Sequence, residues 1–166
     1  NLAAGINDNT WAYQTEAVNL PAGENTITYQ VDAENSGEVS LDRISMSWMY
    51  EAEEAEKYGG NDNTDMHPGY SGDGFASGYN NTGYGRKFTF NAPKAGQYTL
   101  AMRYAAGQDD SACRTLSLLV NGQRTQVKIN SLRSWSLWWD HLSTVELKEG
   151  ENTIQIEKQA DDNGSV

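Results

Sequence analysis

Two glutamates placed two positions apart are the first residues that point to chemistry. They are Glu51 and Glu53, in the stretch MYEAEEAEKYGG. Residues two apart in a β-strand project from the same face, so a strand here would bring both carboxylates together. Neighbouring carboxylates either share a proton or bind a cation, and hard oxygen ligands favour Ca²⁺. An acidic, solvated strand face is an equally good interpretation of this spacing.

A catalytic role for these carboxylates is a third interpretation. A small glycosidase or polysaccharide lyase would use Glu51, Glu53 or Glu54. Glycosidase carboxylates, however, face each other across a cleft and do not stand side by side on one strand. The sequence also contains no G-x-S-x-G nucleophile motif. These observations favour a cation site or a solvated face over catalysis.

Three tryptophans lie within five positions of SLRSWSLWWDHLS. In an alternating strand Trp139 faces away from Trp138, so the three rings cannot all belong to the core. Trp135 lies nearer the preceding turn, and we expect it to form an exposed platform. A flat indole face suits the apolar C–H face of a pyranose ring, with Asn and Asp side chains reading the hydroxyl groups. The motif therefore suggests sugar binding.

The segment from residue 57 to 85 is crowded with Gly, Asn, Asp and Tyr. Such a loop contributes little core but can shape a surface site on a rigid scaffold, and the alternative is a mobile connection without a role. Asn61, Asn63 and Asp65 occupy alternate positions, as in a calcium loop. Because the later glycine and glutamate of that motif are absent, we interpret this part as a polar loop.

Short bursts of alternating apolar and polar residues predict an all-β fold. They are KFTFNA, QYTLAMRY, RTLSLLVNG, TQVKI, STVELKEG and NTIQIEK. Each has the length of a strand and is bounded by turn residues, which favours an antiparallel β-sandwich. We predict hairpin connections in NAPKAGQYTL and LVNGQRTQV, and Asn121-Gly122 is the strongest two-residue turn signal.

The charge balance disfavours anionic partners. The chain has 12 Lys and Arg against 23 Asp and Glu, a formal net charge of -11, which argues against nucleic acid and an anionic membrane surface. No apolar run approaches the roughly 18 residues of a membrane span. Cys113 is the single cysteine, so no intrachain disulfide forms, and we expect it to be a small buried apolar residue.

An internal repeat links the two ends of the chain. The stretch VNLPAGENTI near the start returns as VELKEGENTI near the end, and the constant offset places Trp11 on Trp138. This correspondence favours a packing role for Trp138. The first copy continues beyond Val39 with SLDRISM, whereas the second copy stops at Val166.

Residues 49–166 resemble the carbohydrate-binding modules of family 35, which are related to family 6. The resemblance rests on an ordered set of stretches: YEAEEA, GYSGDGFASGYNNTGYGRKFTFNAPKAGQYTLAMRYAAG, RTLSLLVNG, SWSLWW, VELKEGENTIQIEK and NGSV. It implies a jelly-roll β-sandwich like that of galactose-binding domains, without catalytic activity. It further implies a secreted module attached to the catalytic domain of a multimodular glycan-active enzyme, which it targets to plant or microbial polysaccharide.

The resemblance also implies two sites. A structural calcium ion would be bound by Glu51, Glu53 and the Asp of a closing LDxI strand, and Asp42 in LDRI is the one residue that matches. A polysaccharide or oligosaccharide would be bound by loop residues at one edge of the sandwich. By position these are Trp135, Tyr84, Asn80, Asn81, Asp162 and Asn163. A structural or adhesion sandwich without a sugar site remains a further alternative.

Residues 1–46 resemble the C-terminal portion of a preceding module of the same kind, and residues 47–166 form the carbohydrate-binding sandwich. Two arrangements are open. Either residues 1–36 are the remainder of a neighbouring module, or EVSLDRISM forms a hairpin with WMYEAEEA and supplies the closing strand. The second arrangement would bring Asp42 to Glu51 and Glu53.

Overall fold

The computed structural model describes residues 16, 18–21, 23–30, 40, 41, 43–107 and 113–163. The chain divides into two compact units, Asn1–Ser45 and Met46–Val166, and each is described by itself. Within the described ranges, no helix has the length and apolar character needed to cross a membrane.

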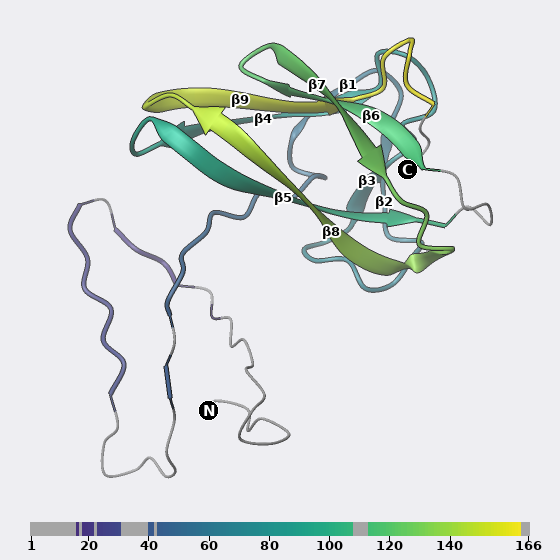
Figure 1. Ribbon diagram of the computed structural model, residues 1–166. Helices are drawn as coiled ribbons and strands as arrows, with labels where there is room; N and C mark the ends of the chain where they lie inside the picture. The colour runs from purple at the N-terminus through teal and green to yellow at the C-terminus, as the bar shows by residue number, and fades with distance from the viewer. Residues whose placement is uncertain are drawn as a thin grey trace. The chain divides into compact units, whose positions relative to one another are not determined.

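The second unit is built from short antiparallel strands (Figure 1). Those found in the described residues are β1 (Glu56–Tyr58), β2 (Asp62–Thr64), β3 (Phe75–Ser77), β4 (Gly85–Ala92), β5 (Gly96–Ala106), β6 (Arg114–Val120), β7 (Gln123–Ile129), β8 (Ser134–Leu147) and β9 (Gly150–Glu157). A five-stranded sheet has the order β1-β4-β9-β6-β7, and two-stranded sheets join β5 to β8 and β2 to β3. Every pairing is antiparallel.

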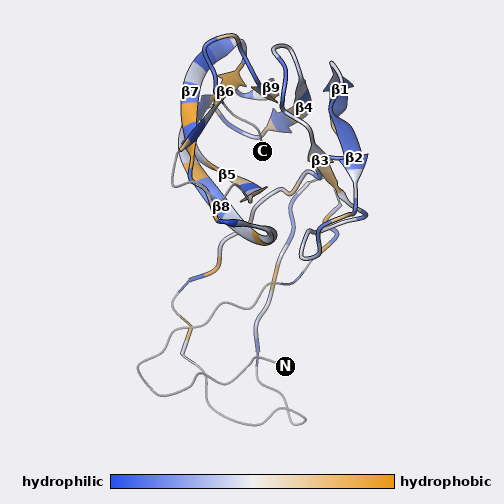
Figure 2. Ribbon diagram, turned by 90° about the vertical axis from the view of Figure 1, so that its right-hand side faces the viewer, coloured by the Kyte–Doolittle hydropathy of each residue, from blue (hydrophilic) through white to orange (hydrophobic). Residues whose placement is uncertain are grey.

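The core lies between the five-stranded sheet and the β5–β8 pair, which form two layers (Figures 1 and 2). Alternate residues of both layers point inward, as the sequence periodicity predicts. The buried side chains include Leu116, Leu118, Ile154 and Ile156 from one layer and Tyr104, Val145 and Leu147 from the other. The predicted antiparallel β-sandwich is thus confirmed.

The hairpin predicted at Asn121-Gly122 joins β6 to β7. Val120 pairs with Gln123, which leaves a two-residue loop. Asn121 and Gly122 have φ angles of 49° and 81°. Two successive positive φ values match the turn that Asn-Gly favours, because its twist agrees with that of the flanking strands.

The hairpin predicted for NAPKAGQYTL is wrong. β4 pairs with β1 and β9, whereas β5 pairs with β8, so the chain between Ala92 and Gly96 crosses from one layer to the other. A turn signal specifies that the chain reverses but not which sheet receives the next strand. Here the apolar faces of the two strands meet across the core instead of sharing a ladder.

The segment from residue 57 to 85 is more structured than the sequence suggests. It contains β2 and β3, which pair with each other, and it buries Asn61 and Tyr79 almost completely. Burial raises the pKa of the Tyr79 hydroxyl to about 12. The expectation for Cys113 is also wrong, because its side chain is exposed and its thiol contacts Asn130 Oδ1 at 3.2 Å.

Candidate functional site

The acidic stretch before β1 forms a turn, so the predicted strand is wrong there. The Glu54 amide donates to the Glu51 carbonyl oxygen at 3.3 Å, and the Ala55 amide donates to the Ala52 carbonyl oxygen at 3.4 Å. β1 begins at Glu56. Alanine and glutamate have low β-propensity, which explains why AEEAE does not extend the strand.

The carboxylates of Glu51 and Glu53 nevertheless converge on the same short loop. Glu51 Oε2 accepts a hydrogen bond from Ser71 Oγ at 3.0 Å, and Glu53 Oε1 accepts from the Asp73 and Gly74 amides at 3.1 and 3.2 Å. A Cβ atom on Gly72 would lie 2.6 Å from Glu53 Oε1 and 3.0 Å from Glu51 Cδ. Both carboxylates therefore pack against one glycine, side by side.

This convergence fits part of a hard-cation site. The structure supplies two carboxylates, and the described residues contain no group of three or more His, Cys, Asp or Glu side chains arranged to hold a metal ion. Asp42, the predicted third carboxylate, lies outside the described residues. The side-by-side arrangement also differs from the carboxylates of a glycosidase, which stand across a cleft.

Asn63 lies in β2 and not in a calcium loop. Its amide nitrogen donates to the Glu53 carbonyl oxygen at 2.9 Å, and its amide oxygen accepts from Arg86 Nη2 at 2.6 Å. The contacts agree with the predicted polar character of this stretch, but the predicted loop is wrong at Asn63, which belongs to a strand. A hollow of about 290 Å³ lies beside it, and its walls are Glu53, Asn63, Thr64, Asp65, Asp73 and Gly74.

The predicted sugar platform, Trp135, is half-buried at the start of β8. Its indole stacks on the imidazole of His67, with ring centroids 5.9 Å apart and planes inclined by 15°. It also packs against Gly107, where an added Cβ atom would lie 2.3 Å from Cδ1. A second hollow lies against Met49, Tyr50 and β4. Trp135 lines neither this hollow nor the one beside Asn63.

Trp138 packs in the way the repeat predicts. Its ring meets Phe75 edge-on at 5.1 Å, and its Nε1 donates to the Pro68 carbonyl oxygen at 3.0 Å. Trp139, by contrast, is 64% exposed. The neighbouring tryptophans thus face different surroundings, as alternation requires.

The glycine-rich loop brings Asn80, Asn81 and Tyr84 to the end of β9. Lys158 Nζ donates to the Asn80 carbonyl oxygen at 2.8 Å, and the Lys158 amide donates to the Tyr84 carbonyl oxygen at 3.0 Å. The Tyr84 amide donates to the Asn81 carbonyl oxygen at 3.1 Å. The Tyr84 ring lies on the backbone of Gly60, while the side chains of both asparagines are exposed.

Asp162 is buried and Asn163 is exposed, and both anchor the chain after β9 to β6. Asn163 Oδ1 accepts from the Thr115 amide at 2.8 Å. The Asp162 carboxylate accepts from Ser117 Oγ at 2.6 Å and from Gln126 Nε2 at 2.9 Å. Burial opposes ionisation of Asp162, but these donors and the nearby Arg124 outweigh it and lower the pKa of its carboxyl. In this structure the Asp162 carboxylate therefore fixes the chain after β9 against β6 and β7.

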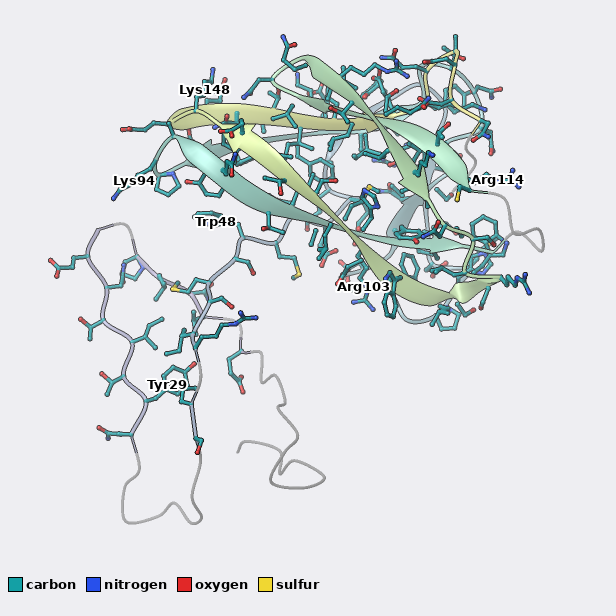
Figure 3. All side chains as sticks on the ribbon, viewed as in Figure 1. Tyr29, Trp48, Lys94, Arg103, Arg114 and Lys148 are labelled. Carbon is teal, nitrogen blue, oxygen red and sulfur yellow. The ribbon has the colours of Figure 1, made fainter. Side chains whose placement is uncertain are left out.

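The predicted sugar-site residues lie at one end of the sandwich, because they adjoin the strand ends where Gly85 pairs with Glu157 and Ala106 pairs with Ser134. Arg114, where β6 begins, marks this end, and Lys94 and Lys148 mark the opposite end (Figure 3). At the Arg114 end β5 and β9 finish and β8 begins (Figure 1). The predicted sugar-site residues form three clusters there: Trp135 with His67, the loop from Asn80 to Tyr84, and the pair Asp162–Asn163.

His67 and Gly107 are absent from the sequence-based site although both contact Trp135. His67 has no histidine partner at metal-ligand spacing, so the sequence gives it no role. Its place among Pro68, Tyr70 and Phe75 in an aromatic-rich loop is the signal that points to ring stacking.

Comparison with known protein families agrees with the resemblance seen in the sequence. The model of the carbohydrate-binding module of family 35 matches residues 48–164. The chain belongs to family 35. Family 35 modules bind carbohydrate and are not catalytic. The fold and the resemblance in sequence thus agree on the same family.

Similar proteins are mostly much larger than this family 35 chain. A 1,6-alpha-glucosyltransferase of Sporosarcina globispora is 38% identical over 175 residues, which cover 100% of this chain but 14% of the transferase. A cycloisomaltooligosaccharide glucanotransferase of Paenibacillus sp., solved with cycloisomaltoheptaose, superposes with a TM-score of 0.64 at 28% identity, covering 70% of this chain and 16% of that one. A family 35 module from Clostridium thermocellum gives a TM-score of 0.63 at 30% identity, with coverage of 70% and 88%.

Proposed function

We propose that this family 35 module binds α-linked glucans without catalysing their cleavage, and so keeps a secreted, multimodular glycan-active enzyme near its polysaccharide. The observation that carries the proposal is the half-buried Trp135 indole at the loop end of the sandwich. A fixed aromatic face with polar loops around it is the usual construction of a sugar site.

The choice of an α-glucan rests on the relatives. The names of the transferase from Sporosarcina globispora and of the glucanotransferase from Paenibacillus sp. refer to α-1,6-glucosyl transfer and to cyclic isomaltooligosaccharides. The net charge of -11 also favours a neutral ligand, because an acidic surface repels polyanions. Asn80, Asn81, Tyr84, Asp162 and Asn163 remain the proposed polar contacts.

Calorimetric titration with cycloisomaltoheptaose and with panose tests this function. We expect saturable binding by the whole chain and at least about tenfold weaker binding by Trp135→Ala, since losing a central aromatic contact costs about 2 kcal/mol or more. Trp139→Ala is the matched control and should bind normally. Loss of binding in the control alone would mean that Trp139, and not Trp135, is the sugar platform. Sugar release by the pure chain, abolished by Glu53→Gln, would instead favour an enzyme.

We also propose a structural calcium ion bound by Glu51 and Glu53, with Asp42 as the third carboxylate. The support is the convergence of the first two carboxylates on Gly72 and the preference of Ca²⁺ for oxygen ligands. A chelator should lower the melting temperature, because only the folded site gathers the ligands. The chelator should have no effect on Glu53→Gln. An unchanged melting temperature in the wild type would reject the ion.

Residues 1–46 are proposed to be the C-terminal portion of a second module of the same kind. The internal repeat supports this proposal, because residues 18–27 have the same turn sequence and apolar pattern as residues 145–154. Its LDRI strand is proposed to supply the closing strand of the second unit, as the calcium site requires, and an engineered disulfide between positions 42 and 53 tests this arrangement. The variant would carry Asp42→Cys and Glu53→Cys in a Cys113→Ala background. Rapid oxidation to one intrachain disulfide supports the closing strand, and its absence argues for a neighbouring module.

A further inference from the structure

The indole of Trp135 lies face-on against the backbone of Gly107. A Cβ atom built on this glycine would lie 2.3, 2.4 and 2.5 Å from Cδ1, Cγ and Nε1 of the indole. Three neighbouring ring atoms at nearly equal distance place that point over the ring face and not beside its edge. Any residue larger than glycine at position 107 would therefore push the indole away.

His67 lies almost parallel to the same ring. The 5.9 Å separation and 15° inclination fall in the range of offset stacking, which prefers centroids about 4.5–7 Å apart. The imidazole also lies against Phe75, with centroids 5.9 Å apart and planes inclined by 25°. His67 thus contacts an aromatic ring from β3 and one from β8.

The loop that carries His67 is itself tied down. Trp138 Nε1 donates to the Pro68 carbonyl oxygen at 3.0 Å, and Arg103 Nη2 donates to the Gly69 carbonyl oxygen at 2.9 Å. An added Cβ atom on Gly69 would lie 2.9 Å from Trp138 Cδ1. Contacts from β5 and β8 therefore fix the two residues that follow His67, which leaves its ring little freedom to move away from Trp135.

We propose that Gly107 and His67 are positioning residues that hold the Trp135 indole in its binding orientation before the sugar arrives. The inference rests on the proposed function, in which Trp135 is the sugar platform. An indole that is already fixed loses little side-chain freedom on binding, whereas a freed one must be ordered by the ligand. Ordering one side chain weakens binding by about 2- to 10-fold.

The variants separate positioning from folding. His67→Ala removes the stacked ring and should weaken binding of cycloisomaltoheptaose by about 2- to 10-fold. His67→Phe keeps a flat ring and should restore the wild-type affinity. Gly107→Ala should weaken binding at least as much as His67→Ala, because the added methyl group overlaps the indole. His141→Ala, the other histidine of the chain, is the matched control and should bind like the wild type.

An indole NMR signal provides a readout that a merely structural role would not change. In His67→Ala and Gly107→Ala the Trp135 Nε1–H resonance should shift and broaden in the free protein, and saturating sugar should sharpen it again. His67→Phe should keep one sharp resonance.

The outcomes distinguish this inference from the function on which it rests. Absence of sugar binding by the wild-type chain would overturn both. Wild-type binding that is lost in Trp135→Ala but unchanged in His67→Ala and Gly107→Ala would overturn the positioning role alone. Failure of His67→Phe to restore binding would also overturn the role of the stacked ring. Melting temperatures of all variants should stay close to that of the wild type, which checks that the variants fold.

Discussion

The two copies of the GENT turn form the same local structure in the two units. The Asn25 side chain donates to the carbonyl oxygens two and four positions before it at 2.9 and 3.0 Å, and the Asn152 side chain makes the corresponding bonds at 2.8 Å each. Gly23 and Gly150 both have positive φ, at 110° and 84°. The hydrogen bonds and the backbone of the turn are therefore repeated along with the sequence.

The apolar residues on either side of the turn differ between the copies in how far they are buried. In the second unit the apolar residues flanking the turn are between 5% and 8% exposed; they are Val145, Leu147, Ile154 and Ile156. Their counterparts in the first unit are between 40% and 59% exposed; they are Val18, Leu20, Ile27 and Tyr29, the last labelled in Figure 3.

The difference separates local from non-local determinants of structure. The turn needs contacts within five residues, so it forms wherever its sequence occurs. Burial of Ile154 needs β4 and β6, where it pairs with Phe88 and Val120. No described residue of the first unit belongs to a strand. The same apolar pattern therefore builds a core in one unit and stays exposed in the other.

The largest expected effect separates the copies by burial. Ile154→Ala should lower the free energy of unfolding of the second unit by about 2–5 kcal/mol, because it removes a buried side chain and leaves a cavity. Ile27→Ala should change it by less than about 0.5 kcal/mol, as for an exposed position. Urea unfolding followed by tryptophan fluorescence measures both. Equal losses would mean that the first copy is packed as well.

A smaller effect concerns the turn itself. Asn152 is 1% exposed, and its amide oxygen also accepts from the Lys148 amide and from Asn121 Nδ2. Asn152→Ala should therefore cost about 1–3 kcal/mol, since it leaves buried groups without partners. Asn25→Ala should leave the unfolding of the second unit unchanged, because water can replace its bonds. A cost of the same size at both positions would contradict this distinction.

The smallest effect depends on pH. The first copy has Asn35 where the second has Asp162, so Asp162→Asn gives the second copy the residue of the first. The folded pKa of Asp162 is lowered, so its contribution is present above the unfolded pKa and is lost as pH falls through the folded value. Asp162→Asn should cost about 1 kcal/mol at pH 7 and progressively less on acidification. A cost independent of pH would argue against an ionised carboxylate.

Much of the second unit follows from its sequence, because alternation identifies β4 to β9 and Asn121-Gly122 identifies one hairpin. The change of layer between Ala92 and Gly96 cannot be predicted from the sequence, because a turn signal does not determine in which sheet the next strand pairs. Glu51 and Glu53 show a similar limit. Their proximity was predicted from a strand, but a turn and the loop around Gly72 produce it.

The candidate sugar site shows the same division. Trp135 is identifiable as a candidate platform from its residue type and from its place before two further tryptophans. His67 and Gly107 are not identifiable, because they meet the indole from positions 68 and 28 residues earlier, and a stacking partner leaves no mark in local sequence. Asp162 is an acid near the end of the chain in sequence, but its buried hydrogen bonds to Ser117 and Gln126 appear only in the fold.

Indole NMR signals recorded during titration with cycloisomaltoheptaose test most directly whether the second unit binds sugar through Trp135. The five tryptophan Nε1–H resonances would be assigned by single substitutions. The account predicts a large, saturable shift of Trp135, a smaller shift of Trp138, and no change at Trp11, which occupies the equivalent of Trp138 in the first unit. An unchanged Trp135 resonance at saturation, or a shift confined to Trp11, would contradict it.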